Sequence, residues 1–285
     1  MRRRTIVAGM FYPAEPERCR SEVARLLRDA GSSLPAGPFV AGLVPHAGWA
    51  YSGKTAARTF AALAASGTPD VLVLFGAVHT WSVVRPSIYG RGSWETPLGD
   101  IDVDETLSRD ILQLARDRID DDPRAHAEEH SLEVQLPFVR YLFPQARIVP
   151  IAVPPTPTAV QLGEWVADVV QTSGKRVCVV GSTDLTHYGP RYGHVPAGVG
   201  AAALTWAKEN DRRLLDRILA LQAEQIVPLA SQEHSACGAG AIAATTAAAR
   251  RLGARQGILL EYTTSYDVHP AGAPTDFVGY AAVAF

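Results

Sequence analysis

The sequence is poor in cysteine, and its three cysteines form no recognisable set. Cys19, Cys178 and Cys237 are far apart and odd in number, which argues against a disulfide framework and against a Cys-x-x-Cys zinc site. Cys178 lies inside the apolar run 177–180, so we expect a buried core residue, and Cys19 lies on a charged, helical segment. Only Cys237 stands among glycines and small residues, which makes it the one candidate for chemistry.

A surplus of charge of one sign and long apolar runs are also missing. Lys and Arg total 27 against 29 Asp and Glu, and the basic residues are scattered, so the sequence predicts no basic surface of the kind that attracts nucleic acid. No apolar run approaches the roughly 20 residues of a membrane span. The apolar stretch after Met1-Arg-Arg-Arg4 is broken by Gly9 and ends at Pro13, too short for a signal peptide. We therefore expect a cytoplasmic protein whose partner is a small-molecule substrate or another protein, with no nucleic acid and no membrane.

Several catalytic motifs are absent. The sequence contains no Gly-x-x-x-x-Gly-Lys-Ser/Thr loop, no Gly-x-Ser-x-Gly elbow and no His-Glu-x-x-His helix. Gly238-Ala-Gly240 is only a fragment of a dinucleotide fingerprint. These absences disfavour phosphate-loop enzymes and serine hydrolases.

Short apolar runs alternate with segments of helical period along the chain, which is the pattern of an α/β domain with a largely buried sheet. We predict a single domain over residues 1–285, with a central, mostly parallel or mixed sheet flanked by helices. Strands are predicted at 39–44, 71–75, 147–153, 176–181, 258–263 and 278–285. Helices are predicted at 15–30, 53–65, 104–116, 131–142, 159–172, 197–221 with a break near Asn210, and 237–252. The alanine-rich stretch 239–249 predicts a helix that approaches its neighbours closely.

Six residues occupy positions where apolar runs give way to Gly, Ser, Thr or Pro. In an open α/β sheet, residues just beyond the carboxyl ends of the strands converge on one crevice, where ligands bind. The residues that we assign to one candidate site on this ground are His46, His79, His130, Asp184, His187 and Cys237.

His46 and His79 each follow an apolar strand, and two imidazoles at neighbouring strand ends are a usual way to provide two ligands of a divalent transition metal. Cys237 can supply a third ligand, because a thiolate at a helix N-terminus is favoured by the helix dipole and by free backbone N–H groups. Glu133 and Asp184 are the competing third ligands. Two histidines with a carboxylate form the facial triad of non-haem Fe(II) enzymes, whereas a set with cysteine is softer and also suits copper or zinc.

Asp184 and His187 are spaced so that one turn would let the carboxylate orient the imidazole, an arrangement that suits acid and base catalysis near neutral pH. A capping Asp with a surface histidine is the structural alternative. Glu133 has capping-type spacing after His130 and can be purely structural. The remaining histidines lack strand-end placement, and we expect them at the surface or in support of the site: His126, His194, His234 and His269.

Five segments together resemble the Memo family, also called AmmeMemoRadiSam system protein B in prokaryotes. They are Ala8-Gly-Met-Phe-Tyr-Pro13, Pro45-His-Ala-Gly-Trp-Ala-Tyr-Ser-Gly53, Glu129-His-Ser-Leu-Glu-Val-Gln-Leu-Pro137, Ser182-Thr-Asp-Leu-Thr-His-Tyr-Gly189 and Ala236-Cys-Gly238. Their order and spacing match through Val278-Gly-Tyr-Ala-Ala282, so the likeness covers nearly the whole chain. The family's fold is similar to that of class III extradiol ring-cleavage dioxygenases, which use a non-haem Fe(II) held by two histidines and a carboxylate.

The resemblance implies that His46, His79 and Cys237 are the metal ligands, that His187 and Asp184 lie beside them, and that His130 lines the same cleft. A cysteine stands where the dioxygenases use a glutamate. A thiolate ligand would alter the redox potential and could itself oxidise.

We therefore expect a metal-dependent redox enzyme of this family, with His187, Asp184 and His130 as catalytic residues. Iron(II) is the expected ion, with copper or zinc as alternatives, and an oxygenase acting on a small aromatic substrate is the expected activity. The alternatives are a non-catalytic metal-binding or protein-interaction scaffold and a zinc- or cysteine-dependent hydrolase. The aromatic residues that flank the histidines and are predicted to wall the pocket are Trp49, Tyr51, Trp81 and Tyr188.

Overall fold

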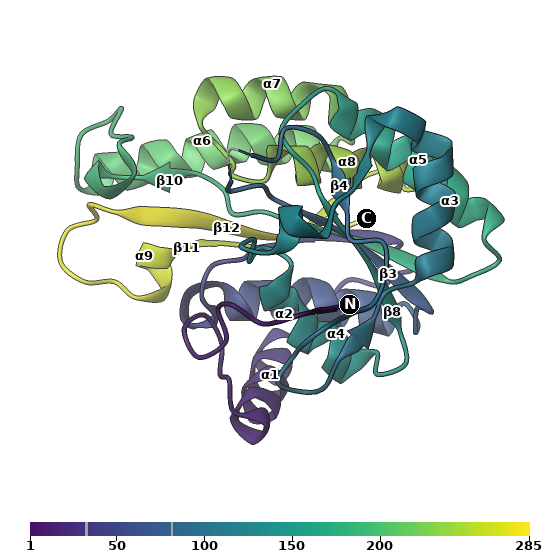
Figure 1. The fold of residues 1–285 in the computed structure, drawn as a ribbon. Helices are drawn as coiled ribbons and strands as arrows, with labels where there is room; N and C mark the ends of the chain where they lie inside the picture. Colours follow the sequence, from purple (N-terminus) through teal and green to yellow (C-terminus); the bar gives the residue numbers. More distant parts are fainter. Residues whose placement is uncertain (32–33, 81) are drawn as a thin grey trace.

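A mixed β-sheet runs through the middle of the molecule, with helices on both of its faces (Figure 1). The computed structural model describes residues 1–31, 34–80 and 82–285. Strands of this sheet follow one another in the order β10-β12-β2-β9-β3-β8-β4-β7, and β11 pairs with β12. Their bounds in that order are His187–Tyr188, Phe277–Ala284, Ala41–Val44, Val177–Ser182, Val71–Gly76, Arg147–Ala152, Ser87–Ile88 and Asp120–Asp121, with Ile258–Thr264 for β11.

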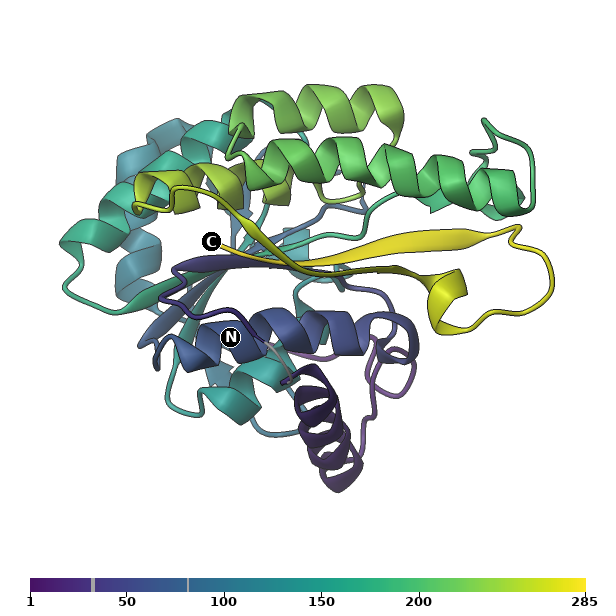
Figure 2. The same cartoon turned by 180° about the vertical axis from the view of Figure 1, so that it is seen from behind.

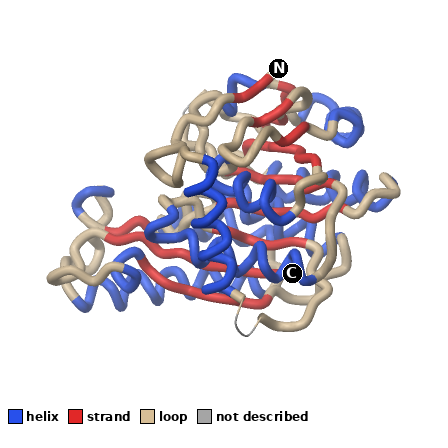
Figure 3. The backbone as a smooth tube through the Cα atoms, turned by 90° about the horizontal axis from the view of Figure 1, so that it is seen from below, coloured by secondary structure: helices blue, strands red, loops and turns tan. Residues whose placement is uncertain are grey.

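The centre of the sheet is parallel and its margins are mostly antiparallel. Strands β2, β9, β3 and β8 pair in parallel, whereas β12 runs antiparallel to β2, to β10 and to β11, and β4 runs antiparallel to β8. A second, small sheet consists of β1 (Arg2–Arg3), β5 (Ser93–Trp94) and β6 (Ile101–Asp102). Figure 3 shows the strands of the large sheet side by side, with the N-terminus near the short strands at one end. The predicted α/β fold with a mixed sheet flanked by helices is confirmed.

Each face of the sheet has its own hydrophobic core, because successive side chains of a strand point to opposite faces. In β3, Val71, Val73 and Phe75 belong to one buried cluster, and Leu72 and Leu74 belong to the other. Such a strand is apolar throughout rather than alternating, as in other sheets that are covered on both faces.

Two layers of helices cover these cores (Figures 1 and 2). One layer contains α1 (Pro16–Ala30), α2 (Trp49–Ala65) and α4 (Leu136–Leu142). The other contains α3 (Glu105–Ala115), α5 (Thr158–Thr172), α6 (Ala201–Leu219), α7 (Ala223–Glu233) and α8 (Ala239–Arg251), and the short α9 is Ser265–Val268. Single 3-10 turns are found at Arg116–Arg118, Pro123–His126, Glu133–Gln135 and Pro190–Tyr192.

Several helix boundaries differ from the predicted ones. Helix α6 runs without a break through Asn210, whose buried side chain donates to Thr186 Oγ1 and to the Glu233 carbonyl instead of disturbing its own helix. Helix α7 was not predicted. The segment predicted as a helix over 131–142 starts with a 3-10 turn and becomes α-helical only at Leu136.

The predicted close approach of the alanine-rich helix is confirmed. A Cβ atom on Gly163 of α5 would collide with the Ala244 carbonyl of α8, so the two helices are in backbone contact at this point. Within the described ranges, no helix is both long and apolar enough to cross a bilayer.

Candidate metal centre

Three of the predicted site histidines converge at the carboxyl end of the parallel strands. His46 follows β2, His79 follows β3, and His130 lies just before the 3-10 turn at Glu133–Gln135. The ring centroids are 5.2 Å apart for His46 and His79, 5.5 Å for His46 and His130, and 4.9 Å for His79 and His130. One ring nitrogen from each lies within 4.8 Å of the others, so this group can hold one metal ion. His130, predicted as a catalytic residue, therefore lies within reach of the same ion as the two predicted ligands.

Hydrogen bonds fix the tautomer of His46. Ser182 Oγ donates its proton to the Ser131 carbonyl at 2.7 Å, so the hydroxyl oxygen accepts from the His46 Nδ1–H at 3.1 Å. Nδ1 then carries the proton, and Nε2 keeps a free lone pair. A metal-binding histidine usually has this arrangement, with its second nitrogen held by a protein acceptor.

Glu129 holds His79 in the same way, although the sequence did not single it out. The carboxylate oxygens lie 3.0 and 3.1 Å from His79 Nδ1, and they also accept from the backbone N–H of His79 at 2.9 Å and of Ser131 at 2.8 Å. Glu129 is 50 positions from His79, and its place next to His130 was the only signal in the sequence. This carboxylate orients the ring so that Nε2 is left for a ligand.

Burial and neighbouring charges set the protonation of the three imidazoles. Burial lowers the pKa of His46 well below its ordinary value, and His79 and His130 lower it further. Burial also lowers the pKa of His130, with His79 adding to the effect. Burial would lower the pKa of His79 too, but the hydrogen bond and charge of Glu129 outweigh it and raise that pKa. His46 and His130 are therefore neutral near pH 7, the form in which an imidazole binds a metal.

Cys237 lies against this group. Its Sγ is 3.2 Å from His46 Nε2 and accepts from the Asp184 backbone N–H at 3.3 Å. Helix α8 begins at Ala239, so Cys237 precedes the helix. Burial and then the charge of Asp184 raise the pKa of the Cys237 thiol. The dipole effect expected from the sequence is thus outweighed, and the free thiol is protonated near neutral pH.

Asp184 acts mainly on the loop that carries His46. Its buried carboxylate accepts from the His46 backbone N–H at 2.7 Å. Among the hydrogen bonds and ion pairs of the described residues, none joins Asp184 to His187, so the predicted orientation of that ring does not involve direct contact. Burial lowers the pKa of His187 and the charge of Asp184 opposes this, while burial raises the pKa of Asp184. Asp184 therefore influences His187 through its charge.

Glu133, a competing third ligand in the sequence, is occupied elsewhere. Its fully buried carboxylate accepts from Arg3 Nη1 at 2.7 Å, from the Ile6 and Val7 backbone N–H groups at 2.9 Å and from Tyr12 Oη at 2.9 Å. Glu133 is structural, but as a buried anchor rather than on a helix surface. It holds the N-terminal segment over the site, where the Phe11 ring lies 5.0 Å from that of His130.

The other histidines occupy three kinds of place. His126 is completely buried, with Nε2 3.0 Å from the Ser87 carbonyl, so of the two places expected for it, the surface or a position that supports the site, the surface is wrong. His269 is exposed, with Nε2 3.0 Å from the Ala50 carbonyl. His194 and His234 lie close together, with ring centroids 5.1 Å apart, on the side of the site that carries His187.

Of the aromatic residues predicted to wall a pocket at the histidines, Trp49 and Tyr188 have buried rings, although Trp49 also contributes to the wall of the groove described below. Trp49 Nε1 donates to the Val134 carbonyl and Tyr188 Oη to the Gly198 carbonyl, and both rings are buried. Tyr51 is exposed against His269, and Trp81 lies outside the described residues. Among the described residues, the aromatic rings beside site imidazoles are Phe11 at His130 and Tyr192 at His187, the latter 5.1 Å away. Phe11 belongs to the motif 8–13, which was the available signal.

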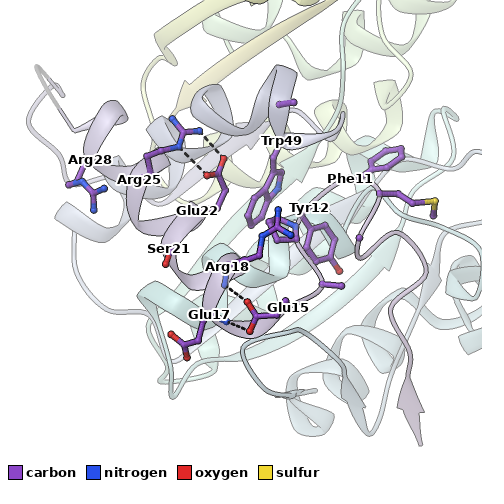
Figure 4. Close-up of a pocket in the computed structure, with 15 residues that line it drawn as sticks. Phe11, Tyr12, Glu15, Glu17, Arg18, Ser21, Glu22, Arg25, Arg28 and Trp49 are labelled. Carbon is purple, nitrogen blue, oxygen red and sulfur yellow. Dashed lines mark hydrogen bonds and ion pairs between the residues drawn. The ribbon is translucent and has the colours of Figure 1, made fainter.

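Two of the cavities formed by the described residues bear on the site. A cavity of about 290 Å³ is lined by His187 and Cys237. A larger groove of about 1030 Å³ lies between α1 and the loop 9–14 (Figure 4). The described residues that line the groove include no histidine or cysteine, and its charges are partly neutralised within its own wall, as in the Glu22–Arg25 ion pair. Of the two, the smaller cavity is the one that contains predicted site residues, His187 and Cys237, whereas His46, His79 and His130 are not among its described lining residues.

Comparison with known proteins gives full-length matches. The family model described as Memo-like protein matches residues 3–284. A MEMO1 family protein of Pyrococcus furiosus is 38% identical over 99% of this chain and 98% of its own length, and one of Methanopyrus kandleri is 38% identical over 100% and 99%. A third, from Methanosarcina acetivorans, is 38% identical over 99% of this chain and 98% of its own.

Proposed function

Because the chain belongs to the Memo family, we propose that it is a metal-dependent redox enzyme that binds one transition-metal ion, iron(II), through His46, His79 and Cys237. The observation that carries the metal site is the group of three imidazole nitrogens of His46, His79 and His130 within 4.8 Å of one another. Cys237 is proposed as the third ligand because its Sγ lies 3.2 Å from His46 Nε2 and because the family resemblance implies it. His130 is the alternative third ligand, and otherwise a proton carrier beside the ion.

The Cys237 and His46 donor atoms fit such an ion. Two ligand atoms on one tetrahedral metal lie about 3.3 to 3.8 Å apart when the bonds are 2.0 to 2.3 Å long, and the 3.2 Å between Cys237 Sγ and His46 Nε2 is close to that range. His46 and His79 both have Nδ1 held by an acceptor, which leaves Nε2 for coordination. A set of two imidazoles and a thiol suits iron, copper or zinc. A bound ion would supply Lewis-acid and redox chemistry to a substrate beside it.

His187 is the group placed to move a proton. It lines the 290 Å³ cavity together with Cys237, and its lowered pKa keeps it neutral near pH 7, so it can accept a proton from a substrate hydroxyl. The buried charge of Asp184 would stabilise the imidazolium that results. The Phe11 ring lies 5.0 Å from that of His130 in an edge-to-face arrangement.

The ligand set is tested by metal analysis of anaerobically purified protein and its variants. Replacing His46 and His79 with Ala together should remove the metal while the fold remains. Cys237→Ser should weaken binding and abolish any absorption from thiolate-to-metal charge transfer, because a hydroxyl is a poor donor to a soft site. His130→Gln should retain the metal. The opposite pattern, with metal kept in Cys237→Ser and lost in His130→Gln, would establish a three-histidine site instead.

The redox function is tested by oxygen uptake with a panel of catechols. If a substrate is turned over, His187→Ala should keep its metal and lose about 100-fold in activity, the usual scale for a general acid or base. Full activity in that variant would remove His187 from the mechanism. Metal-loaded protein that consumes no oxygen with any substrate would favour a binding scaffold, and metal-free protein inactivated by alkylation of Cys237 would indicate a thiol nucleophile.

A further inference from the structure

Two adjacent polar residues, Asn210 and Asp211, are buried in the middle of helix α6, although both residue types are poor helix formers. Among the hydrogen bonds and ion pairs of the described residues, none joins Asp211 to a Lys, Arg or His side chain. Burial raises the pKa of its carboxyl group to about 6. Burying such a group without a cation costs stability, and an apolar side chain would fill the same space without that cost. The two residues therefore need an explanation other than the stability of the helix.

The Asp211 carboxylate holds the peptide that precedes His187. Its Oδ1 accepts from the Thr186 backbone N–H at 2.9 Å, and its Oδ2 accepts from Tyr262 Oη at 2.8 Å, so both oxygens are fixed. Strand β12 leaves room for the carboxylate, because a Cβ atom on Gly279 would collide with Oδ2. The same glycine donates its backbone N–H to the Thr186 carbonyl at 3.0 Å. Both backbone groups of Thr186 are therefore held, and they set the direction in which the chain enters His187.

Asn210 joins the same segment to the end of α7. Its Nδ2 donates to Thr186 Oγ1 at 3.0 Å and to the Glu233 carbonyl at 2.9 Å. Glu233 is the last residue of α7, and a short connection leads from it to Cys237. The amide therefore ties together the two segments that bring His187 and Cys237 to the 290 Å³ cavity.

We propose that Asn210 and Asp211 are positioning residues of the candidate site, and that Asp211 acts on His187 through the backbone of Thr186. The proposal rests on the proposed function for what His187 does with a proton. Neither Asn210 nor Asp211 is among the described residues that line the cavity, so their effect is indirect. Strand β10, which carries His187, is only two residues long, so its place depends on such side-chain contacts. A displacement of about 1 Å in a catalytic group can lower a rate about 100-fold.

The position of His187 is tested by NMR titration of its imidazole, in protein prepared with zinc because the filled d shell of this ion leaves the signals sharp. Burial lowers the pKa of His187 in the wild type. The charges of Asp184 and His79 also act on it, and the Tyr192 ring lies 5.1 Å away. Asp211→Leu removes both acceptor oxygens, so the segment before the ring should shift, and the pKa of His187 should rise toward its ordinary value as the ring meets water. If a substrate is turned over, kcat should fall about 100-fold, with a smaller effect on KM.

Asp211→Asn separates the hydrogen bond from the charge. The amide oxygen can still accept from the Thr186 N–H, while the NH₂ group faces the Tyr262 hydroxyl, which can accept. This conservative variant should therefore restore the wild-type titration of His187.

Two more variants complete the set. Asn210→Leu loses the bonds to Thr186 and to the Glu233 carbonyl, so it should move the pKa of His187 in the same direction, and it tests the proposal even if Asp211→Leu does not fold. The matched control is Ile218→Val, which removes one buried methyl group from the same helix and should leave the titration of His187 unchanged.

Two results would overturn the proposal. If folded Asp211→Leu and Asn210→Leu titrate at His187 like Ile218→Val, the two residues only support the helix. If Asp211→Asn changes the titration as much as Asp211→Leu does, Asp211 acts through its charge and not through Thr186. Neither result depends on turnover, so absence of metal or of oxygen uptake would refute the proposed function and leave the position of His187 to be judged separately.

Discussion

Glu129→Gln tests the metal centre without touching any proposed ligand. The carboxylate of Glu129 accepts three hydrogen bonds, from His79 Nδ1 and from the backbone N–H groups of His79 and Ser131. A glutamine in the same place has one acceptor oxygen and an NH₂ group that can only donate. When that NH₂ faces Nδ1, the His79 proton must move to Nε2, and the nitrogen that would bind a metal is then blocked.

The expected loss follows from the role of such supporting carboxylates. Removing the partner of a metal-bound histidine typically lowers metal affinity 10- to 100-fold, or about 1.4 to 2.8 kcal/mol. The loss should be at the upper end here, because Glu129 contacts both the ring and the backbone of His79. Competition between the apo-protein and a chromophoric chelator would measure it.

Glu128→Gln is the matched control, since Glu128 is the exposed neighbour and its replacement changes the net charge by the same amount. The control variant should bind metal like the wild type. Equal metal affinity in Glu129→Gln and Glu128→Gln, in proteins with the same fold by circular dichroism, would refute the assignment of His79 as a ligand oriented by Glu129.

Three further predictions concern stability. Burial raises the pKa of Asp211 from 3.8 to about 6, so between these pH values the folded chain holds a proton that the unfolded chain releases. In urea unfolding, the free energy of unfolding of the wild type should fall by about 3 kcal/mol relative to that of Asp211→Asn as the pH rises from about 4 to 6. Burial lowers the pKa of His126 from 6.5 to about 4, so as the pH falls the unfolded chain takes up the proton first. The free energy of unfolding of the wild type should therefore fall by about 3 kcal/mol relative to that of His126→Gln as the pH falls from 6.5 to about 4, which is the opposite pH dependence to that of Asp211. Either prediction would be contradicted if the free energy of unfolding of the variant followed the same pH dependence as that of the wild type. Gly163→Ala should destabilise by about 1–3 kcal/mol, because its methyl group would collide with the Ala244 carbonyl, and an unchanged thermal midpoint would show that α5 and α8 can separate at no cost.

The longer strands were predictable because the central ones are buried on both faces, whereas the two-residue strands β1, β4, β5, β6, β7 and β10 were not predicted. A short, continuous run of Val, Leu and Phe is typical of a strand that is covered on both faces of a sheet. The strand predicted at 71–75 is observed at Val71–Gly76, so its bounds agree within one residue. Helix α7 was missed for a physical reason. Pro228 lies inside it, and proline usually marks the end of a helix because it lacks an N–H and clashes with the preceding turn.

The site was predictable where it depends on strand ends and not where it depends on contacts across the chain. The rule that strand ends converge brought His46 and His79 to one place, and these residues are neighbours in the structure, with Cys237 against His46 although it precedes a helix. The same rule has nothing to say about Glu129, which reaches His79 from a different segment. It also could not rank His130 against Cys237 as a ligand, because both lie outside the strands, in segments whose course depends on tertiary packing.

The segment 129–133 connects the metal centre to the N-terminus. Glu129 orients His79, His130 joins the imidazole group, and Glu133 forms the buried ion pair with Arg3. Arg3 also donates to the Glu129 carbonyl at 2.6 Å, so its guanidinium holds both ends of this segment. Loss of one partner of such a buried ion pair strongly destabilises the folded protein, because the other charge is left buried without compensation. The N-terminal strand therefore fixes the backbone that carries Glu129 and His130, and the geometry of the candidate metal centre depends on a contact made more than a hundred residues away.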